Sequence, residues 1–227
     1  MMKYLVLWIA LAGVVLGAPA KGPLQQVDDV EGLPRVLLIG DSISMGYTLE
    51  VRKLLKGKAN VHRPPVNCGP TTRGLEQLDS WLALGGAEKK WDVIHFNWGL
   101  HDLKYIGPKS DRLVPVEREG SRQQVPPDAY RENLRQLVLR LKKTKARLIW
   151  RNTTPVPKGA RGRVPGDAAK YNAIAADIMK EEGVETHDLH SFALKNAAQI
   201  QRKADVHYTG EGSKALAREV VKAINLK

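Results

Sequence analysis

An apolar run that breaks abruptly into glycine and two polar residues constrains the fold of this chain more than any other stretch. Val36 to Ile39 carry no charge, and Gly40-Asp41-Ser42 follows before a helical pattern begins. This predicts a buried strand that leads directly into a helix. A serine at that junction exposes its hydroxyl, and its N–H lies near a helix N-terminus, which favours developing negative charge. Two interpretations stay open: Ser42 is a nucleophile, or Asp41 or Ser42 only caps the helix.

Further along the chain, apolar runs alternate with segments of helical periodicity. Residues 128–143 carry apolar side chains at the spacing of an amphipathic helix with one buried face. The alternation predicts a parallel sheet with helices on both faces. The expected strands are residues 33–39, 60–63, 91–97, 147–154 and 184–189. The expected helices are residues 44–55, a segment from Leu75, 128–143, one through Tyr171, a poorly patterned one near 192–201, and a last one through Leu216.

The N-terminal residues have the pattern of a secretory signal peptide. Lys3 precedes an apolar run that ends at Leu16, and Ala18-Pro19-Ala20 is a small-x-small cleavage site. The run is shorter than the ~20 residues that a membrane-spanning helix needs. We therefore expect residues 1–20 to be removed, with cleavage after Gly17 as the alternative, and residues 21–227 to form a single domain. The mature protein would be secreted or periplasmic, with no stable membrane insertion.

Composition limits the partners that this chain can have. The net charge is +12, which favours anionic partners. The Lys and Arg residues are spread over the faces of the expected helices and do not gather with aromatic residues on one element, so we expect no nucleic-acid partner. The single Cys68 excludes an internal disulfide, so core packing alone must hold the fold.

Several polar loops are expected at one edge of the sheet. Parallel sheets bind ligands outside the carboxyl ends of their strands, where Ser42 and the loops 67–74, 98–103 and 205–207 would lie. His207 precedes the last helix and would be the base for Ser42, with Asp205 orienting its imidazole. The alternative is a surface turn that caps the helix through Thr209. The long segment 104–127 lacks periodicity and would form a rim over the site.

Four short motifs in this chain resemble the blocks of a known family, the SGNH hydrolases or GDSL-type lipases and esterases. Residues 40–43 (Gly-Asp-Ser-Ile) resemble the first block, and residues 67–74 the second. Residues 99–102 (Gly-Leu-His-Asp) resemble the third block, Gly-x-Asn-Asp, and residues 205–207 the last, Asp-x-x-His. The resemblance implies a three-layer α/β/α sandwich with a five-stranded parallel sheet, flavodoxin-like, which is the SGNH hydrolase fold.

The resemblance also implies roles for individual residues. Ser42, His207 and Asp205 would be catalytic. The oxyanion hole would draw on Ser42, Gly69, Thr72, Gly74 and His101. We expect Asp41, Trp98, Asp102 and Asn152 at the same edge to contact substrate. Neither a cofactor nor a metal is expected.

The chain departs from the family pattern in two places. His101 stands where the family has an asparagine that donates to the oxyanion, and imidazole donates only in the right tautomer or when protonated. Asn97, just upstream, is an alternative donor. The acid usually stands three residues before the base, where this chain has Ala204, and Asp205 is one residue nearer. Either Asp205 or a backbone carbonyl would orient His207.

These observations predict an exported serine hydrolase that cleaves an acyl or acetyl ester, including esters of carbohydrates, through a covalent acyl-enzyme. Basic residues near the site suggest an anionic substrate: Lys104, Lys109, Arg112, Arg118, Arg122, Arg161 and Arg163.

Three rivals stay open. Cys68 could serve a cysteine hydrolase, and His95, His101 and Asp102 could bind a transition metal. The rival from another class is a non-catalytic carbohydrate- or surface-binding protein that keeps the SGNH shell. Its stacking platform would be Trp98, Trp150 and Arg151.

Overall fold

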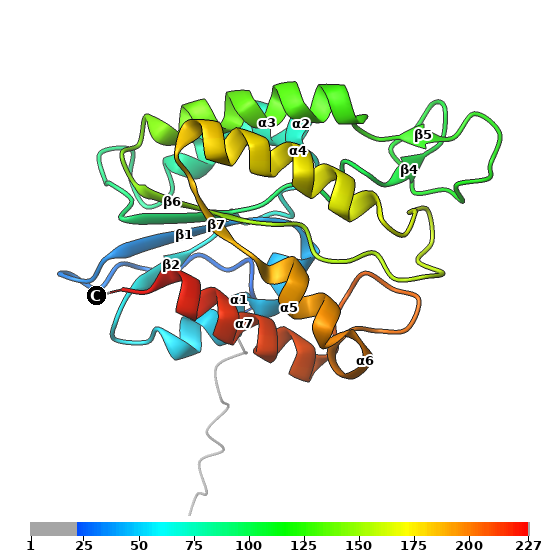
Figure 1. Ribbon diagram of the computed structural model, residues 1–227. Coiled ribbons are helices and arrows are strands. Elements are labelled where there is room, and N and C mark those ends of the chain that lie inside the picture. Colours follow the sequence, from blue (N-terminus) through cyan, green and yellow to red (C-terminus); the bar gives the residue numbers. More distant parts are fainter. Residues whose placement is uncertain (1–21, 227) are drawn as a thin grey trace, which may run out of the picture.

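The computed structural model describes residues 22–226, and the predicted signal peptide, residues 1–20, lies outside the described residues. A five-stranded parallel sheet forms the centre of the molecule, in the strand order β2-β1-β3-β6-β7 (Figure 1). Its strands are β1 (Arg35–Ile39), β2 (Asn60–His62), β3 (Val93–Phe96), β6 (Arg147–Arg151) and β7 (Glu185–His187). The predicted sheet is confirmed, in the order of a flavodoxin-like fold.

Helices cover both faces of this sheet, which confirms the three-layer α/β/α arrangement (Figure 1). One layer contains α2 (Thr71–Leu82), α3 (Pro127–Lys142) and α4 (Asp167–Glu182). The other contains α1 (Ser42–Leu54), α5 (Leu189–Lys195), α6 (Ala197–Ile200) and α7 (Gly210–Ile224). No helix in the described part of the chain is long and apolar enough to cross a membrane.

The core explains why the predicted strands form. Val36, Leu37 and Leu38 of β1 are 0% exposed, because helices pack on both faces of this central strand. Burying an aliphatic side chain of this size stabilises the fold by about 1.5–3 kcal/mol. On α3, Leu134, Leu137 and their neighbours on the same face are also fully buried, as the helical spacing predicts.

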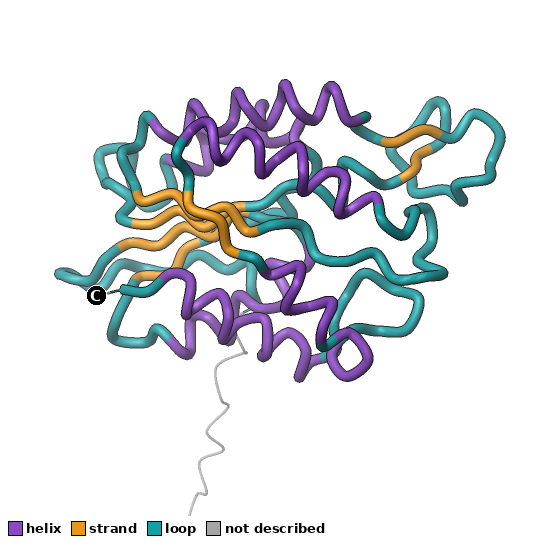
Figure 2. The backbone as a smooth tube through the Cα atoms, in the orientation of Figure 1, coloured by secondary structure: helices purple, strands orange, loops and turns teal. Residues whose placement is uncertain are grey.

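The ends of β1 and β3 lie level, which brings their loops together. Ile39 pairs with Phe96, so the turn after β1 and the loop after β3 leave the sheet side by side. Cys68 in the 67–74 loop donates its N–H to the carbonyl of Gly40 at 3.3 Å. The loops that follow the strands extend beyond the same end of the sheet (Figure 2). The carboxyl edge is therefore built as the sequence predicted.

Local structure differs from the prediction in three places. The 104–127 segment contains a short antiparallel pair, β4 (Tyr105–Ile106) and β5 (Arg122–Gln123), whose two-residue strands leave no periodicity to detect. Helix α2 begins at Thr71, a full turn before the expected Leu75. The helix expected near residues 192–201 is divided into α5 and α6, and Asn196 lies between them.

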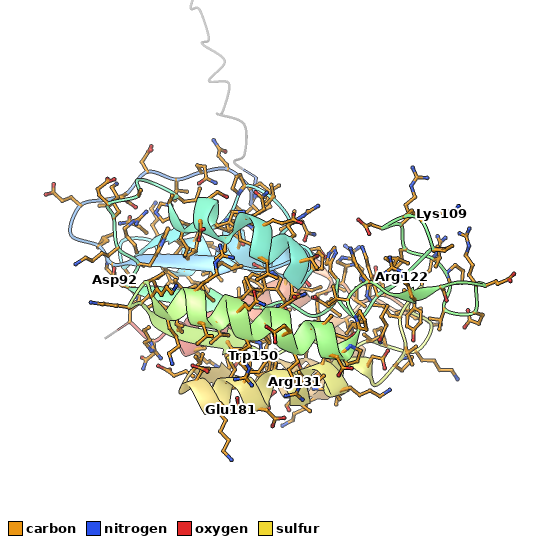
Figure 3. The ribbon with its side chains drawn as sticks, turned by 90° about the horizontal axis from the view of Figure 1, so that it is seen from above. Asp92, Lys109, Arg122, Arg131, Trp150 and Glu181 are labelled. Atoms are coloured by element: carbon orange, nitrogen blue, oxygen red, sulfur yellow. The ribbon has the colours of Figure 1, made fainter. Side chains whose placement is uncertain are left out.

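We call residues 104–125, with β4 and β5, the lobe. It projects beyond the carboxyl edge of the sheet (Figure 1). Lys109 and Arg122 lie on it, at the opposite end of the molecule from Asp92, which precedes β3 (Figure 3). The N–H of Tyr105 donates to the carbonyl of Gly162 at 2.8 Å, so the 158–166 loop is attached to the base of the lobe.

Candidate active site

Ser42 is the first residue of α1, and the turn before it is tightly packed. A Cβ atom on Gly40 would lie 2.7 Å from the Cβ of Ser44, so only glycine fits there. The Asp41 carboxylate caps the helix by accepting the N–H of Ile43 at 3.0 Å. The cap is therefore provided by Asp41, and the hydroxyl of Ser42 remains free for another partner.

That partner is His207, from the far end of the sequence. The Oγ of Ser42 lies 2.9 Å from Nε2 of His207, and Nδ1 of the same ring lies 2.7 Å from Oδ1 of Asp205. The side chains of His207 and Asp205 are 43% and 38% exposed, so the pair lies at the surface. Burial alone would raise the pKa of Asp205, but hydrogen bonds from the side chain and backbone of His207 hold it below its usual value.

A tight turn between α6 and α7 makes the short Asp205-to-His207 spacing possible. Ala204 adopts a left-handed conformation with φ of +52°, which reverses the chain just before Asp205. The N–H of Arg202 donates to the carbonyl of His207 at 3.0 Å and closes the turn. With the proton on Nδ1, the ring donates to Asp205 and leaves Nε2 free to accept the Ser42 proton. The arrangement can activate a serine hydroxyl.

A small cavity of about 250 Å³ adjoins the serine and histidine. Gly46 and Gly210, which have no side chains, leave this space open between α1 and α7. Its lining is completed by Ser42, Ile43, Arg202, His207, Tyr208 and Ser213. The cavity is below the usual size range for drug-sized ligands, roughly 300–1,000 Å³, and suits a small group.

The second motif offers fewer oxyanion donors than predicted. The prediction of Gly74 as an oxyanion donor is wrong, because Gly74 lies within α2 and its N–H donates to the carbonyl of Pro70. A Cβ atom on Gly74 would lie 2.9 Å from the Trp98 ring. The Gly69 N–H donates to Oδ1 of Asn67 at 3.0 Å, and Gly69 has a positive φ of +62°. Within residues 22–226, the Thr72 N–H on the first turn of α2 has no hydrogen-bond partner.

The ring of His101 is partly exposed and makes no hydrogen bond within the described part of the chain. Burial lowers the pKa of His101 to about 4. The charge of Asp41 acts in the opposite direction, whereas the positive charges of Lys104, Arg163 and Arg73 lower this pKa further. The imidazole is therefore neutral near pH 7 and carries a single N–H. The alternative donor Asn97 is excluded, because its amide is buried and bonds to Arg151 and Thr153.

The prediction that Asp102 and Trp98 contact substrate is wrong, because both side chains are buried. Asp102 is 0% exposed, and its Oδ1 accepts the N–H and the hydroxyl of Thr71 at 2.8 and 2.6 Å. These bonds start α2 a turn earlier than the sequence predicted. Burial raises the pKa of Asp102 to about 7, although the bonds from Thr71 oppose it. Trp98 is 1% exposed and packs against Gly74. Neither side chain can reach a substrate.

The other two residues expected to contact substrate, Asp41 and Asn152, form hydrogen bonds within the protein. Asp41 is buried within the 40–42 turn as the α1 cap. Both polar atoms of the Asn152 side chain are used, since the amide donates to Asp188 and the oxygen accepts the N–H of His190. Asp41 is therefore held as the helix cap and is corrected as a substrate contact. Asn152 is partly exposed, and its contact with substrate stays a prediction.

Two buried arginines support the site, and the sequence did not predict their role. Arg63 is fully buried and donates to the carbonyls of Gly40 and Val66 at 3.1 and 3.2 Å, which ties the 40–42 turn to the segment before the 67–74 loop. Arg151 lies 3.9 Å from Asp41 and donates to Asn97 at 2.6 Å. No local sequence pattern indicates these roles, because each guanidinium binds partners that are distant in the chain.

The rival sites do not have the expected geometry. Cys68 is fully buried, and burial raises the pKa of its thiol to about 11, so it is not a thiolate nucleophile. His95 lies 3.1 Å from His187 and not beside His101. Trp150 and Arg151 are as deeply buried as Trp98, so the expected stacking platform does not reach the surface.

Comparisons with known proteins agree with this architecture. The profile of the GDSL-like lipase/acylhydrolase family matches residues 38–215. An acetylxylan esterase from Geobacillus stearothermophilus superposes with a TM-score of 0.65 at 18% identity, covering 86% of this chain and 95% of that one. A lipase/acylhydrolase from Enterococcus faecalis gives a TM-score of 0.66 at 17% identity, covering 85% and 95%. No curated protein sequence gives a significant match.

Proposed function

Because the chain belongs to the GDSL-like lipase/acylhydrolase family, we propose that it is a serine esterase acting through a covalent acyl-enzyme. The observation that carries this proposal is the continuous hydrogen-bonded line from Ser42 through His207 to Asp205, at 2.9 and 2.7 Å. A hydroxyl is a poor nucleophile until a base accepts its proton, and this line supplies an oriented base.

The reaction follows from the positions of these atoms. The Oγ of Ser42 attacks the ester carbonyl carbon while its proton passes to Nε2 of His207. His207 then returns the proton to the alcohol oxygen as the bond from carbon to that oxygen breaks, leaving the acyl group on Ser42. A water molecule repeats the sequence against the acyl-serine, with His207 again accepting and returning the proton. Asp205 stabilises the imidazolium in both halves.

The oxyanion that forms in each half needs N–H donors. The N–H of Ser42 lies at the N-terminus of α1, where the helix dipole favours negative charge. We assign His101 as a second donor, since its ring is partly exposed and has no partner in the described chain. Thr72 or Gly69 supplies the third; Gly69 does so only if its N–H releases Asn67.

The substrate class is proposed from the cavity and the structural neighbours. A cavity of about 250 Å³ beside Ser42 suits a short acyl group such as acetyl. Two of the similar structures are esterases named for acetyl xylan, a carbohydrate acetyl ester. We therefore assign acetyl esters of carbohydrates as substrates. Export is part of the proposal and rests on the pattern of residues 1–20.

The test uses a serine-directed fluorophosphonate and the Ser42→Ala variant. Wild-type protein should be labelled at Ser42 and should hydrolyse 4-nitrophenyl acetate. The variant should keep the wild-type circular dichroism and Tm, take no label, and lose roughly 10⁴- to 10⁶-fold in kcat. An unlabelled wild type, or a variant with most of its kcat/KM, would contradict the esterase assignment.

No observation favours the non-catalytic binding protein as a second candidate. Its stacking platform required exposed aromatic rings, and Trp98 and Trp150 are both 1% exposed. The exposed serine and histidine pair has no role in such a protein.

A further inference from the structure

Three cationic side chains converge beside His101. Arg73 comes from the first turn of α2, Lys104 from the base of the lobe, and Arg163 from the 158–166 loop. The charges of all three residues lower the pKa of His101, and the charges of Arg73 and Arg163 also lower the pKa of Lys104. We call these three residues the cationic cluster. Only two of them were among the basic residues that the sequence suggested, because Arg73 joins them through folding.

Hydrogen bonds to the backbone fix two of these side chains beside the oxyanion loops. Arg163 donates from Nε to the carbonyl of Leu100 at 3.1 Å, next to His101. Arg73 donates from Nη1 to the carbonyl of Asn67 at 3.2 Å, and its side chain packs against Gly69. Both guanidinium groups keep further N–H donors that have no partner within residues 22–226. The cluster therefore presents unused donors at the site.

The cluster also lacks anionic partners among the described residues. No carboxylate lies within salt-bridge distance of any of the three side chains. The acidic groups that act on them at longer range are Asp41, Asp102, Asp111 and Asp205. Asp41 and Asp102 are buried as helix-starting contacts, and Asp205 is held by His207. Asp111 is exposed on the lobe and forms no ion pair with Lys104.

Unpaired like charges disfavour one another, and two members of the cluster, Lys104 and Arg163, are partly buried, whereas Arg73 is exposed. Burial, followed by the charge of Arg163, lowers the pKa of Lys104, and burial lowers that of Arg163. An anion bound beside these side chains would offset the unfavourable burial of the two charges. The other predicted basic residues differ, since Lys109, Arg112, Arg118, Arg122 and Arg161 are exposed to solvent, with Lys109 and Arg122 visible on the lobe (Figure 3).

We propose that Arg73, Lys104 and Arg163 form a carboxylate subsite, so that the preferred substrate is the acetyl ester of an acidic carbohydrate such as a uronic acid residue. This rests on the proposed function. The planar guanidinium fork matches a carboxylate, and Lys104 adds a mobile charge. Because the acetyl group is small and uncharged, the carboxylate belongs to the sugar, which extends from the ester towards the 158–166 loop and the base of the lobe.

A matched substrate pair isolates the charge. One substrate is an O-acetylated oligogalacturonide with free carboxylates, and the other is the same oligomer with its carboxylates methyl-esterified. Acetate release gives kcat/KM for each. The wild type should prefer the anionic oligomer, and this preference should decline as NaCl rises, because salt screens charge with a Debye length of ~10 Å at 0.1 M.

Variants then assign the preference to the cluster. Arg163→Gln and Lys104→Gln should each reduce the ratio of anionic to neutral kcat/KM roughly ten- to hundredfold, mainly through KM. Lys58→Gln is the matched control, because Lys58 is exposed near the start of β2, at the opposite edge of the sheet. It removes the same charge and should leave both substrates unaffected.

Three results separate this proposal from the esterase assignment. Equal wild-type rates on both oligomers would overturn the carboxylate subsite and leave the esterase intact. An equal loss on both oligomers in Arg163→Gln would assign the cluster to the oxyanion or to folding, and would also overturn it. If neither oligomer releases acetate, calorimetry of Ser42→Ala with the two deacetylated oligomers decides, since only the anionic one should bind.

Discussion

Nδ1 of His207 lies 2.7 Å from Oδ1 of Asp205, although the two residues are separated by only Val206. Asp205 also accepts the backbone N–H of His207 at 3.1 Å, so one carboxylate holds both the ring and the main chain. The left-handed Ala204 turns the chain so that this close spacing is possible. The carboxylate thus occupies the position expected of an orienting acid, and no backbone carbonyl has replaced it.

The first prediction concerns this carboxylate. Asp205→Asn keeps the size of the side chain but removes its charge, so it no longer stabilises the imidazolium or fixes the tautomer. We expect kcat for 4-nitrophenyl acetate to fall roughly 10²- to 10⁴-fold with KM nearly unchanged. Steady-state kinetics measure this, and Tm checks the fold. Asp177→Asn, an exposed change on α4, is the control. Wild-type kcat in Asp205→Asn would remove Asp205 from the mechanism.

The second prediction concerns His101, the proposed oxyanion donor that departs from the family pattern. One such donor is typically worth ~2.7–4 kcal/mol of barrier, so His101→Ala should lower kcat by about two to three orders of magnitude. KM should change little, because the contact strengthens as charge develops on the oxygen. His101→Asn, with an amide N–H, should recover part of the loss. Parallel losses of Tm and kcat in both variants would instead indicate a structural role.

The low pKa of His101 adds a second readout. With a pKa of about 4, lowered mainly by burial, its ring stays neutral across pH 6–9 and does not titrate there. The pH profile of kcat/KM should therefore keep its shape over this range when His101 is replaced by asparagine. A profile in which His101→Asn removes an ionisation between pH 6 and 8 would show that the ring acts as a cation.

The third prediction uses the raised pKa of Asp102. An unfolded Asp titrates near 3.8, whereas burial raises the pKa of Asp102 to about 7 in the fold. Between these values the folded protein binds more protons, so its contribution to stability is present at low pH and is lost as pH rises through 7. The upper limit of this loss is about 4 kcal/mol. Asp102→Asn keeps an oxygen for Thr71 and cannot ionise.

Thermal melts of the wild type and Asp102→Asn at pH 5 and pH 8 measure this contribution. The Tm of the variant minus that of the wild type should be larger at pH 8 than at pH 5, by about 5 °C or more. Comparing the two proteins at each pH cancels the titration of other groups. A relative Tm that is independent of pH, or that moves in the opposite direction, would mean that Asp102 is ionised throughout.

Much of the architecture could be predicted because its signals are local. The apolar run of β1 and the spacing of apolar residues in α3 both report burial through neighbours in the sequence. The Gly40-Asp41-Ser42 turn and the loop of His207 could be placed at one edge because parallel strands end together. The β4–β5 pair could not be predicted, since strands of two residues are too short to show a period.

The sequence by itself determined the order of the five central strands and the main helices along the chain, and the side chains available at the carboxyl edge. Only the tertiary structure decided which of those side chains face the site. Asp102 belongs to the third motif and Trp98 directly precedes it, yet packing against α2 buries both. The charges of Arg73 and Arg163 both act on the His101 ring, although the two residues are far apart in the sequence. Burial and electrostatic contact depend on the whole three-dimensional environment of a residue, and no local pattern in the chain encodes that environment.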